Sequence, residues 1–163
     1  MSKRSVDILI FSAVAICVAA GVHITQEFRF YNIESNDLFL YDWSHIRTEL
    51  LRTGGLATLM GSFLTQFMRI PFIGSIIVTV LYLLSAGLLY KSLSKLSGGP
   101  VMAGLSFLPV VFLFLCMEND YYRFQGHIAF ILMLTALYAY ASIPNDRLRY
   151  LAGALTVPVL YHA

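Results

Sequence analysis

The sequence predicts an all-α membrane protein, built as a helical bundle of four complete spans plus a truncated fifth, with an interfacial amphipathic helix in the first outer loop. Hydrophobic residues make up 58% of the chain and charged residues only 12%, whereas a soluble domain usually carries about 25% charged residues. The apolar residues also form long uninterrupted runs. A helix needs about 20 such residues to cross a bilayer core of about 30 Å.

The first two predicted spans lie near residues 6–25 and 71–90. The first contains a single formal charge, Asp7, at its inner edge, and the second contains none. Shorter uncharged runs near 101–117 and 126–143 can cross with local thinning of the bilayer or with help from flanking residues. These runs account for the four complete spans.

A final apolar run, 150–163, is too short to cross a bilayer. We interpret it as an incomplete fifth span, which predicts that the chain is an N-terminal fragment of a longer polytopic protein forming a single transmembrane domain. The alternative is that this run is an interfacial segment that closes a small four-span protein.

The basic residues predict that the N-terminus lies inside, because cytoplasmic loops are enriched in Lys and Arg. This places the outer loop 26–70 and the loop 118–123 outside, and these two loops hold seven of the nine acidic residues. Residues 1–24 are expected to be an uncleaved anchor rather than a signal peptide. The six residues expected inside are Lys3, Arg4, Lys91, Lys95, Arg147 and Arg149.

The first outer loop contains two predicted helices. Asp42 is expected to cap a short helix that stops at Gly54-Gly55. Residues 56–69 follow with apolar side chains at helical spacing, which favours an amphipathic helix in the outer interface, ending in a bend at Pro71. The alternative is a helix packed against the other spans. The expected apolar face consists of Leu56, Leu59, Met60, Phe63, Leu64, Phe67 and Met68.

Several classes of function are excluded by the sequence. It contains no Gly-rich phosphate loop and no CxxC, HExxH or GxSxG motif. A net charge of +2 in a membrane chain gives no support for nucleic-acid binding. The interiors of the predicted spans lack ionisable side chains, which argues against an ion-coupled carrier. The expected partner common to all interpretations is the lipid bilayer.

The strongest candidate site is Glu118-Asn119-Asp120, in the loop between the third and fourth spans. Two carboxylates two residues apart in a tight loop can share a divalent cation such as Mg²⁺ or Mn²⁺, beside a substrate phosphate. The alternative is a solvated turn.

Two further groups lie in the first outer loop or at its start. His23 and Glu27 share one helix face, where they can do acid–base chemistry or simply pair at the level of the lipid headgroups. Asp37 is the acidic residue least explained by local structure. Arg47 and Arg52 can hold a lipid phosphate through two hydrogen bonds or merely neutralise the loop.

This layout resembles the N-terminal part of GT-C type integral-membrane glycosyltransferases, which take sugars from polyprenyl-phosphate carriers. The shared features are one anchor span, a long acidic outer loop with an interfacial helix, and an acidic pair in a later outer loop. The resemblance implies that Glu27 or Asp37 deprotonates the acceptor and that Glu118 and Asp120 bind a divalent metal.

The same resemblance implies that Arg52 or Arg123 holds the departing phosphate. The runs LLRTGGL (50–56) and FLTQF (63–67) are also similar to an uncharacterised family of bacterial multi-spanning proteins. This likeness implies a bacterial cytoplasmic (inner) membrane. The open alternative is a non-catalytic membrane protein or a transporter subunit.

Overall fold

The computed structural model describes residues 3–70, 72–96, 104–119 and 122–162, and these residues form helices and turns without any strand. The predicted all-helical fold is therefore confirmed. The helices are α1 (Lys3–Asn36), α2 (Trp43–Leu50), α3 (Gly55–Thr65), α4 (Ile73–Leu96), α6 (Leu108–Met117), α7 (Gln125–Ser142) and α8 (Asp146–His162).

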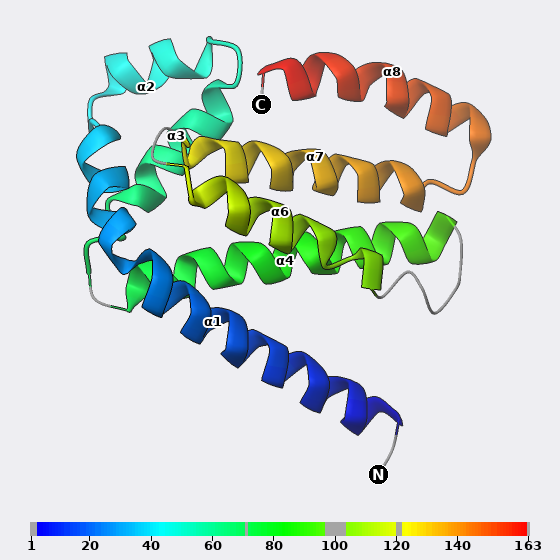
Figure 1. Cartoon of the computed structure of the whole chain (residues 1–163). Coiled ribbons are helices and arrows are strands. Elements are labelled where there is room, and N and C mark those ends of the chain that lie inside the picture. The colour runs from blue at the N-terminus through cyan, green and yellow to red at the C-terminus, as the bar shows by residue number, and fades with distance from the viewer. Residues whose placement is uncertain (1–2, 71, 97–103, 120–121, 163) are drawn as a thin grey trace.

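Helix α7 is central to the arrangement, because it packs against α3, α4 and α8. Helices α4, α6, α7 and α8 run side by side, while α1 crosses α4 at an angle and its N-terminal half extends away from the other helices (Figure 1). Helices α2 and α3 and the α6–α7 connection lie together at one end of the molecule, which we call the polar end (Figure 1).

One described helix, over Ile73–Lys95, is long and apolar enough to cross a membrane, as judged by length and composition. It corresponds to the predicted span 71–90. The predicted bundle of four spans is not confirmed. Helix α6 has only 10 residues, which corresponds to about 15 Å at 1.5 Å per residue, and the described apolar part of α1 covers Ser12–Gln26.

Helix α1 continues through residues 26–36, which the sequence had placed in the outer loop. This stretch contains no glycine or proline to stop it. It also packs on one side, since Gln26 and Phe30 are buried. The helix thus carries the start of the predicted loop onto the polar end.

Helix α8 begins at Asp146, where the Asn145 side-chain oxygen accepts a hydrogen bond from the Arg147 amide at 3.0 Å. It runs back along α7, and the carbonyl of Tyr161 accepts a hydrogen bond from the Gly54 amide at 3.3 Å (Figure 1). Residues 150–162 of the predicted short segment are therefore part of a helix that reaches the polar end.

The predicted helix at 56–69 is confirmed as α3, which ends at Thr65 and is followed by turns before α4. Pro71, the expected bend, lies outside the described residues. Of the expected apolar face, only Met68, after the end of α3, is fully buried. Leu56, Met60 and Phe63 are exposed, and the buried residues are Gly55, Ala57, Gly61 and Thr65. Helix α3 packs on α7, as the alternative interpretation predicted.

Helix α4 buries hydroxyl-bearing side chains beside apolar core residues such as Val78, Leu81 and Tyr82, and it exposes other apolar side chains. Ser75, Thr79, Ser85 and Ser92 are buried, whereas Ile76, Val80 and Leu84 are exposed. The hydroxyls of Thr79, Ser85 and Ser92 donate to backbone carbonyls one turn earlier, at 2.6, 2.9 and 2.8 Å. A surface helix of a soluble protein usually exposes polar side chains on its outer face instead.

Candidate functional site

The α6–α7 connection contacts α1 at the polar end through Glu118. The Gln26 amide nitrogen donates to Glu118 Oε1 at 2.8 Å, and Arg29 Nη2 donates to Glu118 Oε2 at 3.0 Å. Arg29 Nη1 also donates to the Met117 carbonyl at 2.7 Å. Two segments about 90 residues apart are therefore held together by one carboxylate and one guanidinium.

Sequence reasoning identified Glu118 but not Gln26 or Arg29. These two residues are spaced three apart on α1, on either side of the predicted Glu27. The side chain of Glu27 and the whole of Asp120 lie outside the described residues. The structure thus brings Glu118 against α1, and the roles of Glu27 and Asp120 stay predictions.

The other predicted site residues have different neighbours. Asp37 follows α1, and its backbone carbonyl accepts a hydrogen bond from the Thr65 hydroxyl at 3.2 Å. Arg52 pairs with Glu49 at 2.6 Å, with its own side chain 67% exposed. The roles of Asp37 and Arg52 therefore also remain predictions, with Arg52 already neutralised by a local carboxylate.

A surface hollow of about 470 Å³ is lined by residues that precede and follow Glu118 in the sequence. One wall comes from α6 and is apolar, while the other comes from the α6–α7 connection and is polar. The predicted Arg123 belongs to the polar wall. The lining residues are Phe112, Leu115, Cys116, Asn119, Tyr122 and Arg123.

Tyr122 remains protonated in this hollow at neutral pH. Burial raises the pKa of its phenol to about 12, and the neighbouring Cys116 contributes in the same direction. A neutral phenol can donate one hydrogen bond and accept others. It therefore adds a donor to the polar wall.

Behind Tyr122 lies a buried aromatic cluster centred on His127. The His127 ring stacks on Tyr82 and Phe124 with centroid distances of 5.5 and 5.2 Å, and meets the edge of Tyr122 at 5.2 Å. His127 and Tyr82 are fully buried. Neither nitrogen of His127 nor the Tyr82 hydroxyl has a hydrogen-bond partner in the described part of the chain.

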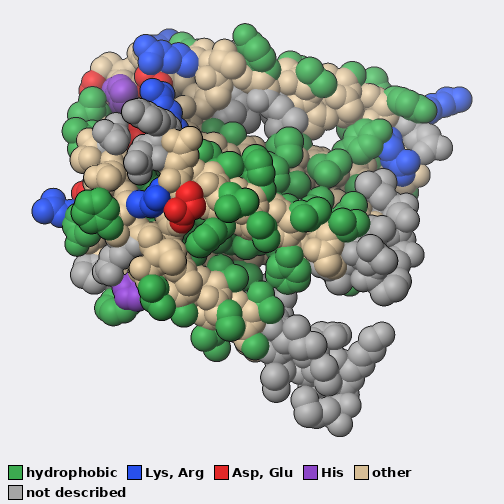
Figure 2. All heavy atoms as spheres, viewed as in Figure 1, with side chains coloured by type: hydrophobic (Ala, Val, Ile, Leu, Met, Phe, Trp, Pro, Cys, Tyr) green, Lys and Arg blue, Asp and Glu red, His purple; other side chains and the backbone are tan. Residues whose placement is uncertain are grey.

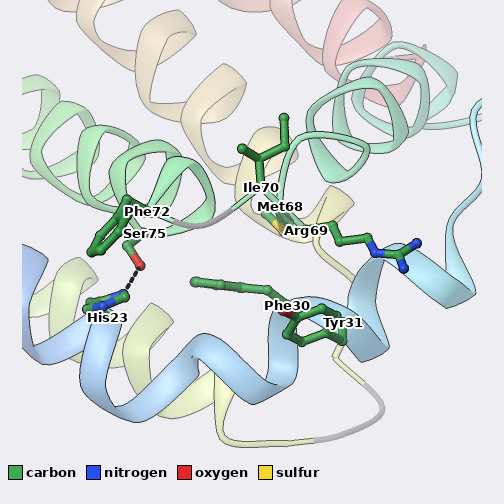
Figure 3. Close-up of a pocket in the computed structure, with 8 residues that line it drawn as sticks. All are labelled: His23, Phe30, Tyr31, Met68, Arg69, Ile70, Phe72 and Ser75. Atoms are coloured by element: carbon green, nitrogen blue, oxygen red, sulfur yellow. Dashed lines mark hydrogen bonds between the residues drawn. The ribbon is translucent and has the colours of Figure 1, made fainter.

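A second, smaller pocket lies between α1 and the start of α4 (Figure 3). His23 Nδ1 and Ser75 Oγ are 3.3 Å apart, and the His23 ring stacks on Phe72 at 4.7 Å. Phe72 has a positive φ of 66°, which is a strained conformation for a non-glycine residue. The open space of about 10 Å³ corresponds to about one water molecule.

The metal site expected at Glu118 and Asp120 stays a prediction. Within the described residues no group of three or more His, Cys, Asp or Glu side chains could hold a metal ion. Both carboxylate oxygens of Glu118 already accept hydrogen bonds from Gln26 and Arg29. A cation bound there would share the carboxylate with these donors, because each oxygen has a second lone pair.

Comparison with known proteins gives a family but no activity. No curated protein and no solved structure matches the chain. A family model does match, over residues 2–163, and it describes a family of unknown function, DUF6057. The match therefore supports the predicted likeness to a family without assigned activity. It does not show the predicted resemblance to glycosyltransferases. The chain belongs to the DUF6057 family.

Proposed function

We propose that the chain is a multi-pass membrane protein that binds a polyprenyl-phosphate-linked lipid in the hollow beside α6 and transfers a glycosyl group from it. In this proposal the N-terminus lies inside and the polar end lies at the outer leaflet of the bacterial cytoplasmic membrane. The single observation that carries it is the hollow itself, which joins an apolar wall to a guanidinium.

The burial pattern supports the membrane part of the proposal. Large apolar side chains point outward from α3, α4 and α6, and small and hydroxyl-bearing residues pack between helices together with apolar core residues such as Tyr82 and Leu113. Helices associate in this way in lipid, where exposing apolar side chains carries no penalty and close contacts favour small residues. Figure 2 adds that acidic, histidine and basic side chains gather at the polar end and that Lys or Arg side chains occur at the opposite end.

The lining of the hollow suits an amphiphile with a phosphate head. Phe112 and Leu115 on α6 are 61% and 62% exposed, so they offer an apolar surface to a hydrocarbon chain. Arg123 and Asn119 lie at the end of that surface. A guanidinium binds phosphate through two charge-assisted hydrogen bonds, and such bonds are about twice as strong as neutral ones.

Glycosyl transfer would break the bond between the anomeric carbon and the phosphate oxygen and form a bond to the acceptor oxygen. The phosphate would leave with the bonding electron pair and remain at Arg123. A carboxylate would take the proton of the acceptor hydroxyl. Glu27 and Asp37 are the proposed bases, because Glu118 is already engaged by Arg29.

The binding step is tested with farnesyl phosphate and detergent-purified protein. Arg123→Gln should lower the affinity about tenfold or more, because a hydrogen bond to a charged group contributes about 1.5–3 kcal/mol and about 1.4 kcal/mol corresponds to a factor of ten. Arg147→Gln removes the same charge at the opposite end and should leave the affinity unchanged. Equal affinities for all three proteins would refute the proposal.

The transfer step needs a separate measurement. Protein incubated with a polyprenyl-phosphate sugar should release the free polyprenyl phosphate as the sugar passes to an acceptor hydroxyl, either of an added alcohol or of water, and this release should fall in Asp37→Asn or Glu27→Gln. If the protein bound the lipid but released no polyprenyl phosphate, the result would favour the other candidate function, a non-catalytic membrane protein that binds this lipid.

A further inference from the structure

The unpartnered polar atoms behind Tyr122 are unusual for an apolar helix bundle. His127 and Tyr82 are fully buried, and together they leave two ring nitrogens and one hydroxyl without hydrogen bonds among the described residues. A buried polar group without a partner costs free energy, so most such groups in proteins are paired. Ionisable side chains retained inside an apolar bundle commonly mark functional sites.

Tyr122 separates these atoms from the hollow. Its side chain lines the hollow, and its ring packs in a T-shaped arrangement against the His127 ring, with the centroids 5.2 Å apart. Gly126 provides the space for this position, because a Cβ atom there would lie 3.0 Å from the Tyr122 hydroxyl. A change of the Tyr122 rotamer would therefore open His127 toward the hollow.

We propose that the hollow continues behind Tyr122 into an inner subsite, formed by His127 and Tyr82, that binds a hydroxyl group of the ligand. A neutral imidazole offers one donor and one acceptor, and a phenol offers both. A hydroxyl group can complement these atoms, as can an internal water in its place. The chemical class indicated is a hydroxyl-bearing head group, such as the sugar of the lipid in the proposed function, on which this part of the inference rests.

The existence of the subsite is tested by the reaction of histidines with diethyl pyrocarbonate, followed by mass spectrometry. His127 in the unaltered protein should be unmodified while the partly exposed His45 reacts. In Tyr122→Ala the reaction of His127 should be at least tenfold faster. Tyr122→Phe keeps the ring and serves as the matched control, in which His127 should stay protected.

A second variant guards against misfolding of Tyr122→Ala. Tyr122→Leu keeps an apolar side chain but removes the ring that packs on His127, and it should also speed up the reaction of His127. Modification of His127 at the unaltered rate in both variants, with His45 reacting normally, would overturn the subsite.

The ligand class is tested by binding farnesyl phosphate and farnesyl phosphoryl glucose to His127→Phe, which keeps a planar ring but loses both nitrogens. The affinity for the glucose-bearing lipid should fall about tenfold, and the affinity for farnesyl phosphate should not. An equal loss for both lipids, or no loss for either, would refute a hydroxyl-binding role. Because labelling of His127 requires no lipid, it can succeed even if the Arg123 experiment fails, so the two proposals are tested separately.

Discussion

At the scale of single residues, Arg29 is the most consequential side chain at the polar end. Its guanidinium contacts both the Glu118 carboxylate and the Met117 carbonyl, and so it also satisfies a backbone acceptor at the end of α6. The two side chains are 25% and 46% exposed. This partial burial makes the ion pair stronger than a fully exposed pair but still partly screened by water.

We expect Arg29→Gln to lower the free energy of unfolding by about 1–3 kcal/mol, because Glu118 loses its counter-charge and the Met117 carbonyl loses its donor. Thermal unfolding in detergent measures this change. Arg47→Gln, on the exposed helix α2, is the control and should shift stability by less than about 0.5 kcal/mol. The prediction fails if both variants melt at the same temperature.

A double-mutant cycle with Glu118→Gln separates the ion pair from the other effects of each substitution. Residues in direct contact usually show coupling of about 0.5–3 kcal/mol. Additive effects would show that the Arg29–Glu118 ion pair contributes no coupling energy.

The sequence pointed to Glu118 because carboxylates are scarce in so apolar a chain. It did not point to Gln26 and Arg29, since their partner is about 90 residues away and no local pattern encodes that contact. His127 was missed for a different reason. A histidine near the start of an apolar run carries no sign that its ring is fully enclosed, and this becomes visible only once α4 and α7 are placed side by side.

At the scale of helices, α3 shows that an apolar sequence pattern can predict a helix without predicting which of its faces is buried. The 3,4 spacing of its apolar residues correctly predicted a helix. It did not predict which side is buried, because the pattern only separates large apolar residues from small and polar ones. In a soluble protein the large apolar face would be buried. Here the small face packs on α7, as in helices that associate in lipid.

The α3–α7 contact predicts that Gly61→Ala destabilises the protein. An added Cβ would lie 2.9 Å from both Cα and Cγ of Gln125, and the Cα atom cannot move without shifting α7. Overpacking of this kind costs about 1–3 kcal/mol. The measurement is again the unfolding temperature in detergent.

Gly87→Ala on α4 is the matched control. A Cβ there meets nothing within 4 Å, so the substitution should be neutral or stabilise the helix by about 0.5–1 kcal/mol. Equal destabilisation by Gly61→Ala and Gly87→Ala would contradict a close contact between α3 and α7.

At the scale of the whole molecule, the two loops that the sequence placed outside do meet at one end (Figure 1). At the opposite end a different contact joins α4 to α7: Lys95 Nζ donates to the Ser142 hydroxyl at 2.5 Å. The arrangement follows from antiparallel helices with short connections. The fold does not determine which side of the membrane each end faces, because this orientation depends on the basic residues near the spans.

Cysteine labelling determines which side each end faces. In a protein with Cys17 and Cys116 replaced by alanine, Ser35→Cys and Asn119→Cys each introduce one thiol at the polar end. Ser94→Cys introduces one near the end of α4, beside Lys95. A membrane-impermeant maleimide applied to intact cells should label positions 35 and 119, whereas position 94 should react only after the membrane is permeabilised.

The result at positions 35 and 119 is constrained by the fold. Ser35 lies in the last turn of α1 and Asn119 lies two residues after the end of α6, and the Arg29–Glu118 pair joins these two segments. They should therefore react from the same side of the membrane. Labelling from opposite sides would contradict the structure as well as the proposed topology, whereas labelling of both only after permeabilisation would invert the topology and leave the fold intact. The proposed site faces the outer leaflet only if positions 35 and 119 react in intact cells.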